Sequence, residues 1–244
     1  MITPPIHWFD EIDSTNEEAK RRASAPAFDD QWIAARRQTA GRGRLGREWK
    51  SPDGNLFATA LFHWSQRIAE AVRVPFATAL AVADIADTFA PGCNAKLKWP
   101  NDVRVDRAKL SGILVESGEG PSGRWLAVGV GVNVAYVPEN IGQAGVCLAD
   151  LAGQVFTVDV ILEALVQRFG ARLEQARREF ADTRRDWLAR GEGLGETIQV
   201  AVDSEHSVGT FEGLGEDGAL LLRLQNGDLR TIRAGDVELI REGR

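Results

Sequence analysis

The sequence is poor in the residues that build metal centres and redox sites. Its 244 residues include two cysteines and three histidines. Cys93 and Cys147 lie far apart, with no C-x-x-C spacing and no histidine cluster nearby, so the pattern indicates neither a zinc site nor redox chemistry. Isolated thiols favour a reducing, cytoplasmic location. The histidines lie outside any motif: His7, His63 and His206.

Long apolar runs and a basic excess are also missing. No stretch approaches the roughly 18 apolar residues of a membrane-spanning helix. The first residues lack the basic start and apolar run of a signal peptide. Acidic residues outnumber basic ones by 35 to 29, giving a formal net charge of -6, whereas nucleic-acid-binding proteins are usually basic. We therefore expect neither a membrane nor a nucleic acid as a partner.

One segment carries the opposite charge. Residues 36–47 contain five arginines and no acidic residue. The segment spells G-x-G-x-x-G, but turn residues follow where a dinucleotide-binding loop opens a helix, and no Gly-Lys-Ser/Thr closes a Walker A loop. Guanidinium groups on a glycine-rich backbone can instead hold phosphate or carboxylate oxygens in pairs. Residues 38–49, the arginine loop, are therefore predicted to bind an anion; the alternative is a solvated basic surface loop.

Strand and helix patterns surround the arginine loop. Strands are predicted at residues 6–12, 31–38 and 55–62, so the loop joins two strands. A helix opens at Ser14, where Ser14 and Glu17 fit a capping box. The alternative role for Ser14, Thr15 and Asn16 is hydrogen bonding to a small polar ligand. An apolar helix is predicted over residues 69–89.

Two later segments carry polar groups beside predicted strands. Trp99-Pro100 forces an extended or turn geometry, and Asn101 and Asp102 supply oxygen ligands there. This segment can hold a nucleotide base or a metal, or it can be an Asx turn that starts a hairpin. Residues 109–116 and 125–134 then predict paired strands. Lys109 is either a solvated edge lysine or a point charge aimed at an anion.

Glycines inside these paired strands are unusual, because interior strand glycines cost stability. Gly112, Gly129 and Gly131 therefore indicate a bulge or a ligand that lies directly on the sheet. From residue 157 the pattern is helical, and a second short helix ends near residue 190. Short strands at 197–202, 207–214, 219–223 and 228–232 predict a small β-barrel. We expect two domains, residues 1–191 and 192–244.

Three segments, GRGRLGREW at 41–49, KWPND at 98–102 and KLSGILVE at 109–116, together resemble the biotin-protein ligases. Residues 13–16 and 129–133 strengthen the resemblance, which extends from about residue 6 to the end. It implies an α+β fold, a mixed sheet with flanking helices similar to class II aminoacyl-tRNA synthetases and lipoate ligases, followed by an SH3-like β-barrel. Larger members carry an N-terminal DNA-binding domain; with a first strand near residue 6, we expect the enzyme without the repressor.

The resemblance implies a ligase reaction in two steps. Biotin and ATP, with Mg²⁺, give biotinyl-5'-AMP and pyrophosphate, and a lysine of a biotin carboxyl carrier protein or domain of acetyl-CoA carboxylase then takes the biotinyl group. A carboxylate must meet an α-phosphate, so cations are needed to hold two anions together, and no serine, cysteine or histidine nucleophile is required. A lipoate or octanoyl ligase and a non-catalytic biotin-sensing protein are the alternatives. Monomer and homodimer both stay open.

The resemblance also assigns site residues. The biotin site would comprise Ser14, Thr15, Asn16, Gln38, Arg42, Gly43, Arg44, Lys109 and Gly112. The nucleotide site would comprise Arg44, Arg47, Trp49, Asn101, Lys109 and Asn133, with Trp49 stacked on adenine. Asp102 would help to hold Mg²⁺, and Arg42, Arg44 and Lys109 would stabilise the reacting charges. We expect the arginine loop to be mobile when empty and to close over the adenylate.

Overall fold

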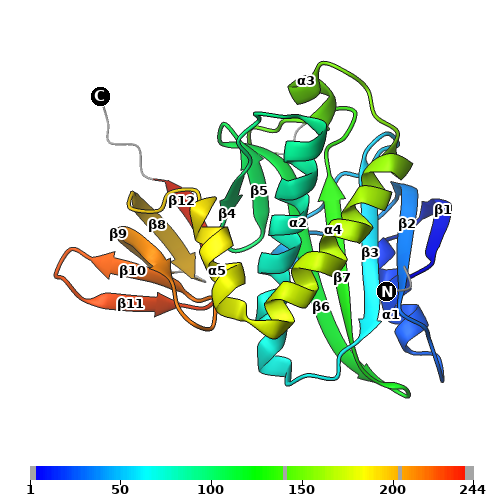
Figure 1. The fold of residues 1–244 in the computed structure, drawn as a ribbon, viewed down its shortest axis with the longest axis horizontal. Helices are drawn as coiled ribbons and strands as arrows, with labels where there is room; N and C mark the ends of the chain where they lie inside the picture. Colours follow the sequence, from blue (N-terminus) through cyan, green and yellow to red (C-terminus); the bar gives the residue numbers. More distant parts are fainter. Residues whose placement is uncertain (1–3, 140–141, 203–204, 240–244) are drawn as a thin grey trace.

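The computed structural model describes residues 4–139, 142–202 and 205–239 (Figure 1). The interpretation of the first residues as lacking a signal peptide falls partly on residues 1–3, which lie outside the described residues. Within the described ranges, no helix is both long enough and apolar enough to cross a membrane.

A seven-stranded mixed sheet forms the main layer of the molecule. Its strands lie in the order β1-β2-β3-β7-β6-β5-β4, with β1 and β2 parallel and the other pairs antiparallel. The strands are β1 (Ile6–Ile12), β2 (Gln31–Gln38), β3 (Leu56–His63), β4 (Lys96–Lys98), β5 (Asp102–Val105), β6 (Ala108–Gly120) and β7 (Gly123–Val132). The predicted strands at 6–12 and 31–38 are confirmed, and the third is shifted by one residue. β6 runs further than predicted, so its connection to β7 is shorter.

Helices cover the two faces of this sheet unequally. α2 (Val74–Phe89) and α4 (Val158–Arg178) lie in front of the sheet in Figure 1. Successive strand side chains point to opposite faces, so Trp32 joins the core under α2 and α4, while Ile33 packs with Ala19 of α1 (Thr15–Ala23) on the other face. α1 spans nine residues and leaves part of its face uncovered. The site described below lies there.

Two predictions at helix starts need correction. The helix expected over 69–89 begins as a 3-10 turn, Ile68–Arg73, and α2 starts at Val74, because Pro75 fits the first helical turn where its missing N–H costs nothing. Ser14 is the N-cap of α1, but its side chain makes no capping hydrogen bond, so the capping box is wrong. Glu17 is engaged by Lys20 and Arg42 instead.

The C-terminal part forms a second, five-stranded antiparallel sheet of SH3-like type, in the order β11-β10-β9-β8-β12. Its strands are β8 (Thr197–Val202), β9 (Glu205–Leu214), β10 (Leu220–Leu224), β11 (Leu229–Ile232) and β12 (Asp236–Leu239). The predicted strands are confirmed within two residues at each end, and the α+β fold class is confirmed. The sequence reasoning missed β12 and the short helix α3 (Leu148–Ala152).

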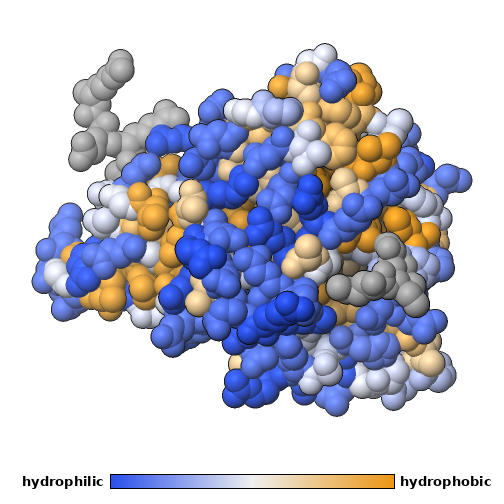
Figure 2. All heavy atoms as spheres, in the orientation of Figure 1, coloured by the Kyte–Doolittle hydropathy of each residue, from blue (hydrophilic) through white to orange (hydrophobic). Residues whose placement is uncertain are grey.

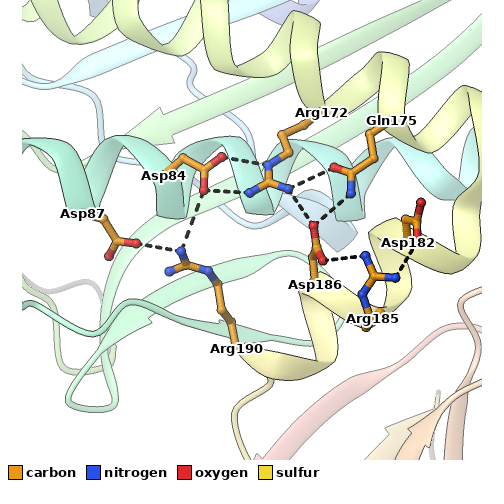
Figure 3. A network of polar contacts seen from close by, with 8 residues as sticks. All are labelled: Asp84, Asp87, Arg172, Gln175, Asp182, Arg185, Asp186 and Arg190. Atoms are coloured by element: carbon orange, nitrogen blue, oxygen red, sulfur yellow. Dashed lines mark hydrogen bonds and ion pairs between the residues drawn. The ribbon is translucent and has the colours of Figure 1, made fainter.

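A polar network ties the helices together beside this second sheet (Figure 3). Arg172 of α4 donates to Asp84 of α2 at 2.7 and 2.9 Å and to Asp186 of α5 (Phe180–Ala189) at 2.9 Å. The hydrogen bonds that Arg172 donates to Asp84 raise the pKa of Arg172. Arg190, which follows α5, donates to Asp87 at 2.6 Å. Hydrophilic side chains cover the centre of this face of the molecule (Figure 2).

Candidate active site

A cavity of about 540 Å³ opens on the sheet face that α1 leaves uncovered. Its walls come from the start of α1, the arginine loop, strands of the main sheet and β12 of the C-terminal sheet. Every site residue predicted from the resemblance lines this cavity: Ser14, Thr15, Asn16, Gln38, Arg42, Gly43, Arg44, Arg47, Trp49, Asn101, Asp102, Lys109, Gly112 and Asn133. The fold therefore brings together segments that are up to 119 positions apart, from 14 to 133.

The floor of the cavity is bare backbone. Gly112 of β6 and Gly131 of β7 are register partners, so two side-chain-free positions lie side by side. The indole of Trp49 lies on this floor: a Cβ added at Gly112 would come within 2.8 Å of Trp49 Cζ3, and one at Gly131 within 2.5 Å of Cε2. Real Cβ atoms are not found that close, so the glycines are needed for this contact.

Trp49 therefore fills space that a flat ligand would use. Its Nε1 is buried and has no hydrogen-bond partner among the described residues. A buried donor without a partner costs free energy. The ammonium of Lys109 lies 5.3 Å from the centre of the indole ring, within the range of a cation–π contact. A ligand ring that lies on the glycines must displace the indole.

Lys109 is not a solvated edge lysine, so that alternative is wrong. Its side chain is 14% exposed, and its Nζ lies 2.9 Å from Asp102 Oδ1. The strand around it is held by backbone bonds to the loop beyond β7: Lys109 N donates to the Ala144 carbonyl at 2.8 Å. Asn133 Nδ2 donates to the Lys109 carbonyl at 3.1 Å. The lysine is thus fixed at the cavity as a point charge.

The three arginines of the loop take different positions. Arg44 enters the cavity: its side chain is 20% exposed, and its Nη1 donates to Asn101 Oδ1 at 3.1 Å. Burial lowers the pKa of Arg44. Arg42 and Arg47 are 46% and 59% exposed and pair with Glu17 and with Asp236 of the C-terminal sheet. The solvated-loop interpretation therefore fails for Arg44 and describes only the outer two.

Asn101 lies in the turn that joins β4 and β5, so the predicted hairpin is confirmed. Its Nδ2 donates to the Ile113 carbonyl of β6 at 2.9 Å, and its Oδ1 accepts from Arg44. These bonds reach across the sheet and into the arginine loop. Neither is the local bond of an Asx turn, so the Asx turn is not what fixes this side chain.

Polar side chains near α1 form one end of the cavity. Thr15 donates through N and Oγ1 to Gln38 Oε1 at 2.8 and 3.1 Å. Gln38 Nε2 donates to Ser51 Oγ at 2.8 Å, and Thr59 Oγ1 donates to Asn16 Oδ1 at 2.6 Å. These groups are buried, except for the half-buried Gln38, and they are already oriented by one another. They suit a ligand with a compact polar head.

Metal binding by the protein alone has little support. Among the described residues, no three histidine, cysteine, aspartate or glutamate side chains gather in a way that could hold a metal ion. Asp102 places one carboxylate at the cavity, and one of its oxygens faces Lys109. Mg²⁺ is commonly bound by one or two carboxylates together with substrate phosphates. Asp102 therefore fits an ion that arrives with a nucleotide.

Five charged residues that line the cavity were not predicted: Glu48, Lys50, Lys98, Asp236 and Glu238. Asp236 comes from β12, and no local signal marked it because its contacts are with the distant arginine loop. Lys98 ends β4 and lines the cavity. Burial lowers the pKa of Lys98, and its side chain makes no hydrogen bond or ion pair with the described residues. Its place within the KWPND segment was a signal that could have identified it.

Comparison with known proteins agrees with this geometry. Residues 8–133 match the Biotin/lipoate A/B protein ligase family, and residues 193–240 match the Biotin protein ligase C terminal domain. The chain is 37% identical over 219 residues to the biotin--[acetyl-CoA-carboxylase] ligase of Paracoccus denitrificans, covering 86% of this chain and 91% of that protein. It is 29% identical to the bifunctional ligase/repressor BirA of Escherichia coli (strain K12), covering 93% of this chain and 72% of that protein.

A solved structure is similar over nearly the whole chain. The biotin protein ligase from Aquifex aeolicus in complex with biotin and ATP superposes with a TM-score of 0.82 at 28% identity. The match covers 98% of this chain and 99% of that one, so it includes both sheets. By sequence over most of its length and by the fold of both parts, this chain belongs to the biotin/lipoate A/B protein ligase family and, within it, to the biotin-protein ligases.

Proposed function

We propose that this protein is an ATP-dependent biotin-protein ligase. It would activate biotin as biotinyl-5'-AMP and transfer the biotinyl group to a lysine of a biotin carboxyl carrier protein or domain. The observation that carries the proposal is the cavity itself, which joins a hydrogen-bonding end, a bare glycine floor and a cluster of cations. Names of relatives support it: curated ligases act on acetyl-CoA carboxylase, and a solved relative binds biotin and ATP.

We propose which part of the substrate each part of the cavity binds. Ser14, Thr15, Asn16, Gln38 and Arg42 line the polar end with the Gly43 backbone, and they suit the ureido head of biotin. The apolar ring and tail would lie on the floor at Gly112 after Trp49 has moved away. The displaced indole could then stack on adenine, with Asn133 and Asn101 beside the nucleotide. Each of these roles is a proposal for this chain.

Cations carry the chemistry of the first step. The biotin carboxylate attacks the α-phosphate, so two anions must approach each other in line. Lys109 and Arg44 are less exposed than Arg42 and Arg47, and they would neutralise the biotin carboxylate and the α-phosphate as charge shifts between them. Arg42 and Arg47 would add to the positive potential of the cavity. Fixed cations in a site that excludes water stabilise the transition state more than they would in solvent. Mg²⁺ bound by Asp102 and phosphate oxygens would neutralise the leaving pyrophosphate.

The polar end of the cavity favours biotin over lipoate. Thr15, Gln38 and Asn16 supply oriented donors and acceptors, which match the N–H and carbonyl groups of a ureido ring. The dithiolane ring of lipoate offers no such groups, and a site built for hydrogen bonds rejects a ligand that leaves them unpaired. A passive biotin sensor would have no use for the cations at the other end.

We further propose that residues 1–191 form the biotin and ATP domain and residues 192–244 the C-terminal domain, with β12 completing the cavity wall through Asp236. Cys93 and Cys147 are free thiols, and burial raises the pKa of both. Thiols of this kind suit the reducing cytoplasm, where we propose that the enzyme acts.

One incubation tests the proposal. The purified protein is mixed with biotin, MgATP and a biotin carboxyl carrier domain, and the intact mass of the carrier is measured. We expect one biotinyl group on one lysine, dependent on ATP. Replacing biotin by lipoate tests the first alternative: lipoyl transfer at an equal or higher rate would overturn the proposed specificity. Biotin binding without ATP-dependent transfer would favour the sensor.

A further inference from the structure

Lys98 is a cavity cation whose neighbouring acids are already paired with other cations. The carboxylates that act on the charge of Lys98 are those of Asp102 and Glu192. Asp102 pairs with Lys109 at 2.9 Å, and Glu192 pairs with Arg104 at 2.9 Å, with the Glu192 side chain only 8% exposed. The described part of the chain offers Lys98 no carboxylate of its own.

The three arginines of the loop differ from Lys98, because each lies near a carboxylate that it can pair with. Arg42 pairs with Glu17, and Arg44 and Arg47 share Asp236. Each of these must give up or share a carboxylate when a ligand arrives, whereas Lys98 has none to give up. A half-buried charge without a partner is costly unless an external anion compensates it. The position therefore calls for a bound anion.

The sheet places Lys98 at one end of a row. From β7 the order of strands is β6, β5 and β4, and the row consists of the register partners Gly112, Asp102 and Lys98; Lys109 of β6 reaches Asp102 through its ammonium. Lys98 and Asp102 are register partners, so they lie directly across from each other. Adjacent strands lie about 4.8 Å apart, so Lys98 lies on the order of 10 Å beyond the strand of Lys109. This direction leads away from the polar end at Gln38 on β2.

A substrate that begins at the polar end must therefore reach Lys98 last. On the proposed function, on which this inference rests, the reacting carboxylate and α-phosphate lie at Lys109. We infer that Lys98 binds the β- and γ-phosphates of the nucleotide and so positions the pyrophosphate that leaves in the first step. In that step the carboxylate oxygen bonds to the α-phosphorus, the bond from the α-phosphorus to the bridging oxygen breaks, and the electron pair leaves with pyrophosphate.

Lys98 would thus contribute to the formation of biotinyl-5'-AMP and not to the transfer of the biotinyl group to the carrier. Once pyrophosphate has left, biotinyl-5'-AMP keeps only the α-phosphate, which lies at Lys109 in the proposed arrangement. A residue that only supported the fold would affect both steps and the binding of every ligand.

The test compares Lys98→Met with a matched control. Lys96→Met removes a lysine from the same strand, two positions away and on the same face, which does not line the cavity. Biotin-dependent exchange between ATP and pyrophosphate gives the KM for ATP and for pyrophosphate. We expect both values to rise by about tenfold or more in Lys98→Met, as for loss of a charge-assisted hydrogen bond. Lys96→Met should stay within about twofold of the wild type.

Two further measurements separate positioning from structure. Biotin binding without nucleotide, and transfer from preformed biotinyl-5'-AMP to the carrier, should keep normal values in Lys98→Met. Lys98→Arg should recover most of the affinity for ATP, since it restores a cation. If Lys98→Met unfolds, the same assays on Lys98→Gln and Lys98→Arg decide the question.

Two results would overturn the inference. One is an unchanged KM for ATP and pyrophosphate in Lys98→Met or Lys98→Gln. The other is an equal loss of biotin binding, ATP binding and transfer. Both differ from a failure of the proposed function, in which the wild-type protein itself would show no biotin-dependent exchange.

Discussion

At the residue scale, the position of Lys109 is set by contacts from three separate segments. Its ammonium pairs with Asp102, its carbonyl accepts from Asn133 and its N–H donates to the Ala144 carbonyl. A charge that is already fixed needs little reorganisation when the reacting groups develop charge. This preorganisation makes Lys109 the residue whose loss should matter most to the first step.

We predict that Lys109→Ala lowers biotinyl-5'-AMP formation by at least on the order of a hundredfold, comparable to losing one donor of an oxyanion hole. Biotin-dependent pyrophosphate release measures the rate. Lys96→Ala, at a position of β4 that does not line the cavity, is the control and should release pyrophosphate normally. Near-normal release from Lys109→Ala would contradict its assigned role.

The glycine floor gives a second prediction. In Gly131→Ala the new methyl group would come within 2.5 Å of the Trp49 indole, and it would also project into the space proposed for the ligand. We expect biotin affinity to fall about tenfold, as for a site that cannot accommodate an extra methyl group. Isothermal titration calorimetry measures it. Gly170→Ala in α4, where nothing lies within 4 Å of the added Cβ, should leave affinity unchanged.

Lys98 gives a prediction about stability and pH. Burial lowers its pKa in the folded protein below the ordinary lysine value of 10.5. Between these two values the unfolded chain binds more protons, so the stability of the wild type rises with pH. Lys98→Met should therefore melt a few degrees higher than the wild type at pH 7, and this gain should shrink as pH approaches 10.5. Calorimetric melting temperatures that differ equally at pH 7 and pH 10 would contradict this.

At the element scale, the arginine loop is held in place by a contact with the C-terminal sheet. Its outer contact is Asp236 of β12, which lies 3.1 Å from Arg47 and 3.7 Å from Arg44. Leu45 between them has a φ of 56° and is 79% exposed, so the loop has little apolar packing of its own. Segments held by few contacts open at low free-energy cost. The loop is therefore suited to move when a ligand enters.

We predict that biotin and ATP protect the loop from proteolysis. Trypsin cuts after arginine, and phosphate groups held by the loop would fix its backbone and remove Arg42, Arg44 and Arg47 from the protease. Mass spectrometry of limited digests gives the cleavage rate between residues 42 and 47. Asp236→Asn should raise that rate in the ligand-free protein, because it weakens the anchor. Equal cleavage with and without ligands would count against closure of the loop.

At the scale of the whole molecule, charge networks join helices that the cavity does not use. Arg172 bonds to Asp84 of α2 and Asp186 of α5, and all three side chains are 30% exposed or less. Removal of the arginine would take the principal partner from two partly buried carboxylates, leaving Asp84 with Arg190 at 3.8 Å and Asp186 with Arg185 at 3.4 Å and Gln175 at 2.9 Å. The network lies on the face opposite the cavity, so its effect should be on stability alone.

We predict that Arg172→Met lowers the free energy of unfolding by about 1–3 kcal/mol, between the values for exposed and buried ion pairs. Urea unfolding followed by tryptophan fluorescence measures it. Arg178→Met is the control, because Arg178 is 77% exposed and pairs only within its own helix, with Glu174. Unchanged KM values for biotin and ATP in the folded Arg172→Met variant would confirm that the effect is on stability.

Much of the fold could be predicted because it depends on local pattern. Strands at 6–12, 31–38 and 197–202 have the bounds expected from alternation and turn residues. The helix start at Val74 was misplaced, since a 3-10 turn and an α-helical turn share nearly the same local preferences. β12 was missed because four residues carry too little periodicity to stand out, and pairing with β8 decides its structure.

The sequence by itself determined the composition of the site. The arginine loop, KWPND and KLSGILVE, with residues 13–16 and 129–133, carry a family resemblance that names many of the residues lining the cavity, though not Lys98 or Asp236. Only the tertiary structure decided how those residues meet: that the indole of Trp49 lies on Gly112 and Gly131, that Asp236 anchors the loop, and that Asp102 and Glu192, the acids near Lys98, pair with other cations. The physical reason is that contact between side chains depends on strand order and register, which pair positions far apart in the chain.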